Sequence, residues 1–249
     1  MPDPFARVGV IVPAAGAGRR LGDQGAKALV RLGERSLIAW ALAGVEANRH
    51  VESVVVVTHP SIVDAVGEVV AARRFAKVRA VVAGGPTRRA SVAAGLAALP
   101  AGPDYVAVHD ACRPLLPAGA IDRLLEALLG MEGRYGIAPG APVTDTVRRV
   151  AAGDCSGGIV DREDLRAIQT PQLYLRRALT AAHRRAAASV DAGEADDAVL
   201  VERAGYPVAV VPGEPVNLKI TTPLDLLAAE ALLARGAGLG KALPDGAPR

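Results

Sequence analysis

The stretch that decides the fold is Val8-Gly9-Val10-Ile11-Val12-Pro13-Ala14-Ala15-Gly16-Ala17-Gly18-Arg19-Arg20-Leu21-Gly22. A β-branched run passes directly into a loop of alanine, glycine and arginine, which predicts a buried strand followed by a ligand-binding turn. Small residues let the loop backbone close on a ligand and aim its N–H groups at an anion. Leu21 occupies the third glycine position of the dinucleotide fingerprint, and no Walker motif follows. We therefore expect an anion-binding loop of another kind; a glycine turn with solvated cations is the alternative.

Outward from this stretch, apolar β-branched runs alternate with Ala/Leu-rich segments of helical length. Strands are expected at 8–12, 53–58, 78–82, 105–109 and 135–138, and helices at 36–47, 61–75, 91–99 and 118–129. Ser36, Ser61 and Ser91 are the expected N-caps of the first three helices. This alternation is typical of βαβ units, so we predict an α/β fold with a Rossmann-like, mostly parallel twisted sheet and helices on both faces.

The alternation is interrupted after about residue 140. Residues 141–171 are rich in proline and glycine and contain short β-like pieces, which predicts a protruding β-arm. Helices at 176–188, 196–204 and 223–234 and a strand at 207–211 then resume the pattern. We expect one domain over residues 1–235, with an arm at about 141–170 and a flexible tail at 236–249.

Composition excludes several classes of protein. The 249 residues carry 29 Lys+Arg and 26 Asp+Glu, a net charge of +3 that is too even for a dedicated nucleic-acid binder. With 51% hydrophobic residues the chain can form a large core, but no apolar stretch reaches the ~20 residues of a membrane span. No signal peptide is evident, so we expect a cytoplasmic protein with no nucleic-acid or membrane partner. Cys112 and Cys155 are expected to be buried free thiols.

Polar and flexible residues follow three predicted strands, at the sheet edge where open α/β sheets bind ligands. In the first loop, Arg19, Arg20 and Lys27 suit a polyphosphate. In the second, Gly84 and Gly85 permit close approach of a base or sugar.

The second and third loops also carry side chains that can bind a ligand or a metal ion. Ser91 can cap a helix or contact a ligand. Asp110 ends the next strand, where a carboxylate can hold Mg²⁺ or a ribose hydroxyl, and His109 beside it can be a core residue. Further along the chain, alternation turns Lys219 away from the apolar Leu218 and Ile220. We expect these groups to face one anionic crevice.

A set of short segments carries a resemblance to a known family. In chain order they are Val12 to Lys27, Gly84-Gly85, Val108 to Pro114, Ala141 to Thr146, Thr170-Pro171-Gln172, Asp196-Asp197-Ala198 and Asn217 to Thr221. From about residue 8 to residue 232, they resemble the motif series of the 2-C-methyl-D-erythritol 4-phosphate cytidylyltransferase family of the non-mevalonate isoprenoid pathway. The ordered set is more specific than any single segment.

The resemblance implies transfer of CMP from CTP to methylerythritol phosphate, with Mg²⁺ required, by a homodimer of nucleotidyltransferase fold. It implies catalytic roles for Arg20, Lys27, Lys219 and Arg162; nucleotide contacts from Ala14, Ala15, Gly16, Gly18, Gly84, Gly85, Ser91 and Asp110; substrate contacts from Thr146, Arg162, Thr170 and Lys219; and a metal contact from Asp110. Thr146 and Arg162 would reach the partner subunit's site from the arm.

The chain departs from the family pattern at three places. Pro86 stands where an acidic residue is frequent, Ala26 and Ala28 flank Lys27, and Ala195 precedes the Asp196-Asp197 pair. A ribitol-5-phosphate cytidylyltransferase and an inactive nucleotide-binding regulatory protein are the alternatives. A dehydrogenase is disfavoured by the missing third glycine. We expect no fused cyclodiphosphate synthase domain.

Overall fold

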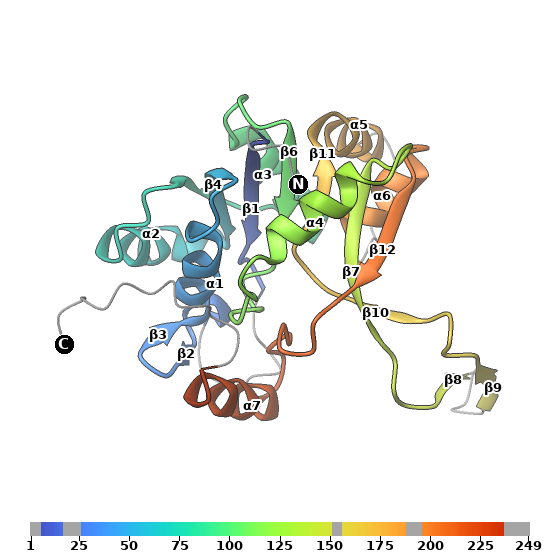
Figure 1. Cartoon of the computed structure of the whole chain (residues 1–249). Helices are drawn as coiled ribbons and strands as arrows, with labels where there is room; N and C mark the ends of the chain where they lie inside the picture. The colour runs from blue at the N-terminus through green and yellow to red at the C-terminus, as the bar shows by residue number, and fades with distance from the viewer. Residues whose placement is uncertain (1–5, 17–25, 151–155, 188–195, 237–249) are drawn as a thin grey trace.

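The computed structural model describes residues 6–16, 26–150, 156–187 and 196–236, and an eight-stranded sheet forms its centre (Figure 1). In spatial order the strands are β10 (Arg166–Ile168), β7 (Gly136–Pro142), β11 (Gln172–Leu175), β6 (Tyr105–Val108), β1 (Val8–Pro13), β4 (Val51–Thr58) and β5 (Val78–Ala83), with β12 (Val208–Pro212) paired to β7. The run at 8–12 that opens the sequence is therefore at the middle of the sheet.

Within the eight-stranded sheet most strand pairs are parallel, as predicted. β1 runs parallel to both β4 and β6, β4 to β5, and β12 to β7. The exceptions are β11, which is antiparallel to β6 and β7, and β10, which is antiparallel to β7. Neither of these two strands is predicted from the sequence, because three or four residues in or after a glycine-rich arm give too short a pattern. The mixed sheet places the 169–171 segment beside the end of β6.

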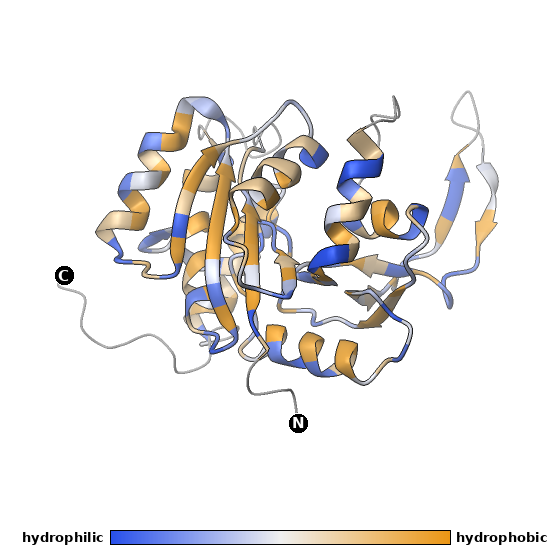
Figure 2. Ribbon diagram, turned by 90° about the horizontal axis from the view of Figure 1, so that it is seen from above, coloured by the Kyte–Doolittle hydropathy of each residue, from blue (hydrophilic) through white to orange (hydrophobic). Residues whose placement is uncertain are grey.

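Helices cover both faces of the sheet because alternate strand residues point to opposite sides. Val10 of β1 packs in one cluster with Leu42 and Leu125, while Ile11 packs in a second cluster with Leu179 and Val201. The first face carries α1 (Leu37–Glu46), α2 (Val63–Ala72) and α4 (Ala120–Leu129), and the second carries α3 (Arg88–Ala98), α5 (Arg176–Ala187) and α6 (Asp197–Arg203). Figure 2 shows the apolar strands between these two layers.

Helix α3 lies close against the sheet. A Cβ built on Gly95 would stand 2.5 Å from Cγ2 of Ile11 and 2.8 Å from Cγ2 of Val57. No real Cβ fits at such distances, so glycine is needed for this close approach. The approach fixes how far the first turn of α3 reaches over the ends of β1 and β4.

The predicted N-caps are wrong at two of three helices. Ser36 stands at the N-cap of α1, but its side chain makes no capping bond. Helix α2 begins after a short 3-10 turn, η3 (Pro60–Ile62), and His59 accepts a hydrogen bond from the Ser61 N–H. Helix α3 begins at Arg88, where Thr87 accepts from the Ala90 N–H. Ser91 is thus inside helix α3 and does not cap it.

A third cluster of apolar residues lies below the carboxyl ends of the strands. Helix α7 (Pro223–Ala234) packs there with Leu32 and Trp40, beside the turn η2 (Lys27–Leu29) and the hairpin β2 (Arg31–Leu32) and β3 (Arg35–Ser36). A capping box between Thr222 and Asp225 starts α7. The cluster anchors the segments that carry Lys27 and Lys219.

A small two-stranded sheet projects from the main one. It consists of β8 (Val147–Val150) and β9 (Ser156–Val160), and Figure 1 shows it standing well away from the other elements. Val150 and Ile159 are exposed on it. The predicted tail, 236–249, lies outside the described residues except for Gly236. Within the described ranges no helix has the length and apolarity that crossing a membrane requires.

Candidate active site

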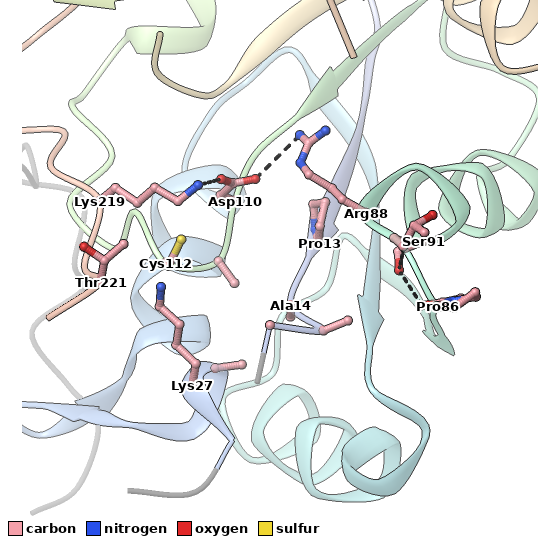
Figure 3. Close-up of a pocket in the computed structure, with 16 residues that line it drawn as sticks. Pro13, Ala14, Lys27, Pro86, Arg88, Ser91, Asp110, Cys112, Lys219 and Thr221 are labelled. Carbon is pink, nitrogen blue, oxygen red and sulfur yellow. Dashed lines mark hydrogen bonds and ion pairs between the residues drawn. The ribbon is translucent and has the colours of Figure 1, made fainter. Parts of the chain in front are cut away.

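A cavity of about 350 Å³ opens at the carboxyl ends of β1 and β6, under the first turn of α3 (Figure 3). Its wall contains loop backbone, three cationic side chains and one carboxylate. The lining residues are Pro13, Ala14, Ala15, Gly16, Lys27, Ala28, Gly85, Pro86, Thr87, Arg88, Ser91, Asp110, Ala111, Cys112, Lys219 and Thr221.

Asp110 is the carboxylate, and cations approach it from two sides. Its Oδ2 accepts a 2.8 Å hydrogen bond from Lys219 Nζ, and its Oδ1 is 3.6 Å from Arg88 Nη2. Burial alone would raise the pKa of Asp110, but the charges of Arg88 and Lys219 outweigh burial and hold this pKa below its ordinary value. Asp110 is therefore an anion at neutral pH.

Two buried side chains beneath Asp110 fix its position. The Asp110 N–H donates to Thr170 Oγ1 at 3.0 Å, and this hydroxyl is 3.3 Å from His109 Nδ1. His109 Nε2 is 3.1 Å from the Arg113 carbonyl oxygen. Because a carbonyl can only accept, Nε2 carries the proton and Nδ1 accepts from Thr170. Burial lowers the pKa of His109 to about 4, so the ring is neutral.

Lys219 reaches the cavity because its segment is tied to the end of β6. The Ile220 N–H donates to the Cys112 carbonyl at 2.8 Å, and Ile220 itself is fully buried. Lys219, between two apolar neighbours, points the other way, as the alternation predicts. Its side chain is 44% exposed, against 11% for Asp110. Lys219 can therefore leave Asp110 for a ligand more easily than Asp110 can move.

The glycine loop before α3 shapes the opposite wall. A Cβ on Gly84 would stand 2.6 Å from Ser91 Oγ, and a Cβ on Gly85 would stand 2.5 Å from that of Ala90. Both glycines thus allow the loop to pack on its own helix, and of the two only Gly85 lines the cavity. Ser91 Oγ donates to the Thr87 carbonyl at 3.0 Å, or to that of Gly85 at 3.4 Å.

Comparison with known proteins identifies the family of this chain. The family model of 2-C-methyl-D-erythritol 4-phosphate cytidylyltransferase (IspD) matches residues 8–235. The chain belongs to this family. A curated 2-C-methyl-D-erythritol 4-phosphate cytidylyltransferase from Nocardia farcinica is 44% identical over 230 residues, which cover 92% of this chain and 95% of the relative.

Longer relatives and solved structures of the cytidylyltransferase family also match. A bifunctional enzyme IspD/IspF from Clavibacter michiganensis is 47% identical, and the match covers 95% of this chain but only 57% of the relative. The crystal structure of 2-C-methyl-D-erythritol 4-phosphate cytidylyltransferase from Thermus thermophilus is 36% identical, with a TM-score of 0.72 and coverage of 92% of this chain and 99% of that one. The α/β fold with a Rossmann-like sheet is thus confirmed.

The structure brings most of the predicted site residues of this cytidylyltransferase family member to one cavity. These are Ala14, Ala15, Gly16, Lys27, Gly85, Ser91, Asp110 and Lys219. Gly84 lies behind the wall against Ser91, and Thr170 lies beneath Asp110. Thr146 and Arg162 are on the arm and do not line the cavity; Arg162 Nη1 donates to the Thr144 carbonyl oxygen within the arm. Gly18 and Arg20 lie outside the described residues.

Eight cavity residues, among them Thr221, Arg88 and Cys112, are not among the predicted site residues. Thr221 follows Lys219 in the same extended segment, and Arg88 is the first residue of α3. Cys112 is half-buried in the wall, not fully buried as expected, and burial together with Asp110 raises the pKa of its thiol. A helix start beside a glycine loop could have indicated Arg88. The sequence does not distinguish it from Arg89, whose Nη1 donates to the Ala186 carbonyl.

The donor set at Asp110 is compatible with Mg²⁺ only when a ligand completes the coordination. In the described ranges no three His, Cys, Asp or Glu side chains are grouped as a metal cage would require. Mg²⁺ commonly uses one or two carboxylates and takes its other ligands from substrate phosphates and water. One cavity carboxylate, Asp110, therefore fits a metal ion that arrives with a triphosphate.

Proposed function

We propose that this chain transfers the cytidylyl group of CTP to 2-C-methyl-D-erythritol 4-phosphate, giving 4-diphosphocytidyl-2-C-methyl-D-erythritol and pyrophosphate. Through its family the chain is an enzyme, a cytidylyltransferase. The observation that carries the proposal is that three cations, Lys27, Arg88 and Lys219, line one cavity together with the carboxylate of Asp110 and a glycine-loop wall. Such a cavity suits two polyanions better than an apolar substrate.

The reaction needs charge neutralisation and alignment more than proton transfer. An oxygen of the acceptor phosphate forms a bond to the α-phosphorus of CTP, and the bond from that phosphorus to the bridging β-oxygen breaks, so pyrophosphate leaves. Because the nucleophile is already an anion, no general base is needed. His109 fits this account, since both ring nitrogens are engaged by Thr170 and Arg113 and its pKa keeps it neutral.

The nucleotide would lie between the first loop and the start of α3. Ala14, Ala15, Gly85 and Ser91 would hold the cytosine, with Gly16 and Gly18 close to the triphosphate and Gly84 supporting the wall. Pro86 also lines the cavity but has no N–H, so residue 86 cannot donate to the base. Asp110 would contact the ribose.

We assign a different phosphate group to each set of cations. Lys27 and Arg20 would stabilise the α-phosphate as charge develops on it, and Lys219 would hold the acceptor phosphate. Thr170 would act through Asp110, because its buried hydroxyl is bonded to the Asp110 N–H and to His109. The 2.8 Å hydrogen bond from Lys219 to Asp110 would then be exchanged for a hydrogen bond from Lys219 to the acceptor phosphate. The partial exposure of Lys219 supports such an exchange.

Mg²⁺ belongs to the same proposal. Asp110 would hold the ion together with the triphosphate, and the ion would supply positive charge to the phosphate oxygens. Asp110 is the one carboxylate among the described residues that line the cavity, and this supports such a role for a nucleotide-borne ion.

We further propose a homodimer in which the arm completes the acceptor site. Thr146 and Arg162 of each subunit would reach the cavity of the other. The arm stands away from the other elements and exposes Val150 and Ile159, which supports a protein contact there. We also propose that the enzyme acts in the cytoplasm.

Pyrophosphate release with alternative acceptors tests the function. Purified protein is mixed with CTP and Mg²⁺ and either 2-C-methyl-D-erythritol 4-phosphate or ribitol 5-phosphate. Turnover with the first acceptor and little with the second is expected. Turnover only with ribitol 5-phosphate would overturn the assigned acceptor, and CTP binding without turnover would indicate an inactive nucleotide-binding protein. Lys27→Ala should abolish most of the rate; an unchanged rate would contradict the proposed role of the cations.

A further inference from the structure

A buried ion pair connects the cavity to the far layer of helices. Asp197, the first residue of α6, is fully buried, and its Oδ2 accepts a 2.6 Å hydrogen bond from Arg88 Nη1. Its Oδ1 accepts a 2.9 Å hydrogen bond from His183 Nε2 of α5. The function proposed above uses Arg88 only as one of the cavity's cations, and it assigns no role to Asp197 or His183.

Arg88 stands between two carboxylates and is bonded to only one of them. Nη1 bonds Asp197, whereas the 3.6 Å from Nη2 to Asp110 Oδ1 exceeds hydrogen-bond length. Figure 3 shows the Arg88 guanidinium facing Asp110 from the side opposite Lys219. The charge of Arg88 thus stabilises the Asp110 carboxylate, but Arg88 makes no hydrogen bond to Asp110 Oδ1.

The distance between the Arg88 guanidinium and Asp110 depends on Asp197. A buried carboxylate without a cation is costly, so Asp197 holds the guanidinium strongly. Arg88 also gains from both carboxylates, which outweigh burial and raise its pKa above the ordinary value. If the charge of Asp197 were removed, the remaining attraction would draw Arg88 onto Asp110. Both Asp110 oxygens would then be engaged, one by Lys219 and one by Arg88.

We propose that Asp197 is a positioning residue for the nucleotide site: it holds Arg88 back from Asp110, so that Asp110 stays open to CTP. His183 orients Asp197 by donating to its second oxygen. The inference rests on the proposed function, in which Asp110 contacts the nucleotide. It adds two residues outside the cavity, Asp197 and His183, to the determinants of CTP affinity.

Asp197→Asn tests the inference against a matched control. An amide offers one carbonyl oxygen to the two donors, Arg88 and His183, and carries no charge to retain the guanidinium. The control is Asp196→Asn at the adjacent position. Asp196 caps α6 by accepting from the Val199 N–H and also bonds Gln172, and asparagine caps helices as well as aspartate does.

If Arg88 competes with CTP for Asp110, the KM for CTP should change and kcat should change little. In Asp197→Asn, the KM for CTP and the CTP dissociation constant from calorimetry without Mg²⁺ should both rise roughly tenfold, the effect of one charge-assisted hydrogen bond. Saturating CTP would displace Arg88, so kcat should change less than about threefold. Asp196→Asn should match the wild type. An unchanged KM in Asp197→Asn, or a loss confined to kcat in proportion to the unfolded fraction, would overturn the inference.

A double variant shows whether the effect passes through Arg88. Arg88→Gln/Asp197→Asn removes both charges together and leaves no unpaired buried ion. The KM of the double variant for CTP should be no higher than that of the worse single variant. Without the Arg88 guanidinium, no side chain at position 88 competes with CTP for Asp110 Oδ1 by charge. Additive increases would contradict the mechanism. His183→Gln, which keeps a donor to Asp197, should raise the KM less than His183→Ala.

The failures of the two proposals are distinguishable. Wild-type turnover combined with identical KM values for the Asp197 and Asp196 variants would reject the positioning role alone. Absence of both CTP binding and turnover in the wild type would reject the proposed function, and the positioning role with it.

Discussion

Acidification should destabilise the fold through His109, and the loss should vanish when this ring is replaced. His109 is fully buried between Thr170 and Arg113, with both ring nitrogens engaged in its neutral form. In the unfolded chain a histidine has a pKa of about 6.5. In the folded protein burial lowers the pKa of His109 to about 4.

The sign and size of the effect follow from these two values. Between pH 6.5 and pH 4 the unfolded chain binds a proton that the folded protein does not, so the free energy of unfolding falls as the pH falls. The contribution is complete above about pH 6.5 and is lost as the pH approaches the folded value. From pH 7.5 to pH 5 the loss from this one group is about 2 kcal/mol.

Urea unfolding at pH 7.5 and pH 5, followed by the fluorescence of Trp40, measures the effect. Trp40 is the single tryptophan of the chain and is buried, with its indole N–H bonded to the Leu32 carbonyl. His109→Gln keeps an amide donor for Arg113 but does not titrate. Its pH-dependent loss should be about 2 kcal/mol smaller than that of the wild type. Equal losses would show that the ring does not stay neutral in the fold.

Three further outcomes test other parts of the structure. Gly95→Ala should cost roughly 1–3 kcal/mol of stability because its Cβ would overlap Ile11 and Val57, whereas Gly67→Ala, with no atom within 4 Å, should gain about 0.5–1 kcal/mol in thermal unfolding; a loss at both sites would contradict the packing argument. Lys219→Met should lower kcat/KM by roughly 10²–10³, while Lys77→Met, whose amine bonds the carbonyls of Glu46 and Asn48, should not. Mixing Lys219→Met with Arg162→Ala protein should restore part of the activity if the arms cross, since one site of each mixed dimer would be intact, and no restoration would place Arg162 in its own subunit's site.

The layers of the fold could be predicted from the sequence because local patterns determine them. The β-branched runs at 8–12 and 53–58 are buried on both faces, so they are uniformly apolar and easy to recognise. The strand β11 lacked such a signal. Its pairing with β6 and β7 comes from tertiary contacts and not from its four residues. The prediction of the helix caps was wrong for a related reason: Thr87 and Ser91 are both residue types that cap helices, and residue type alone does not show that α3 begins after Thr87.

The sequence predicted which single residues after the strands belong to the candidate site, but it did not predict the contacts between them. Lys27, Asp110 and Lys219 were identifiable by type and position, and they line one cavity. That Arg88 is held by Asp197 depends on a contact across 109 residues of sequence, which no local pattern encodes. Thr146 and Arg162 were placed through the family resemblance, and within one subunit they stay on the arm.

The central claim is that an acceptor phosphate attacks the α-phosphorus of CTP in this cavity. The most direct test uses 2-C-methyl-D-erythritol 4-phosphate whose phosphate oxygens carry ¹⁸O, with unlabelled CTP and Mg²⁺, and analyses both products by mass spectrometry. The account predicts that all of the label stays in the cytidylyl product, including its new bridging oxygen, and that the pyrophosphate is unlabelled. Label in the pyrophosphate, or failure to form the cytidylyl product, would contradict it.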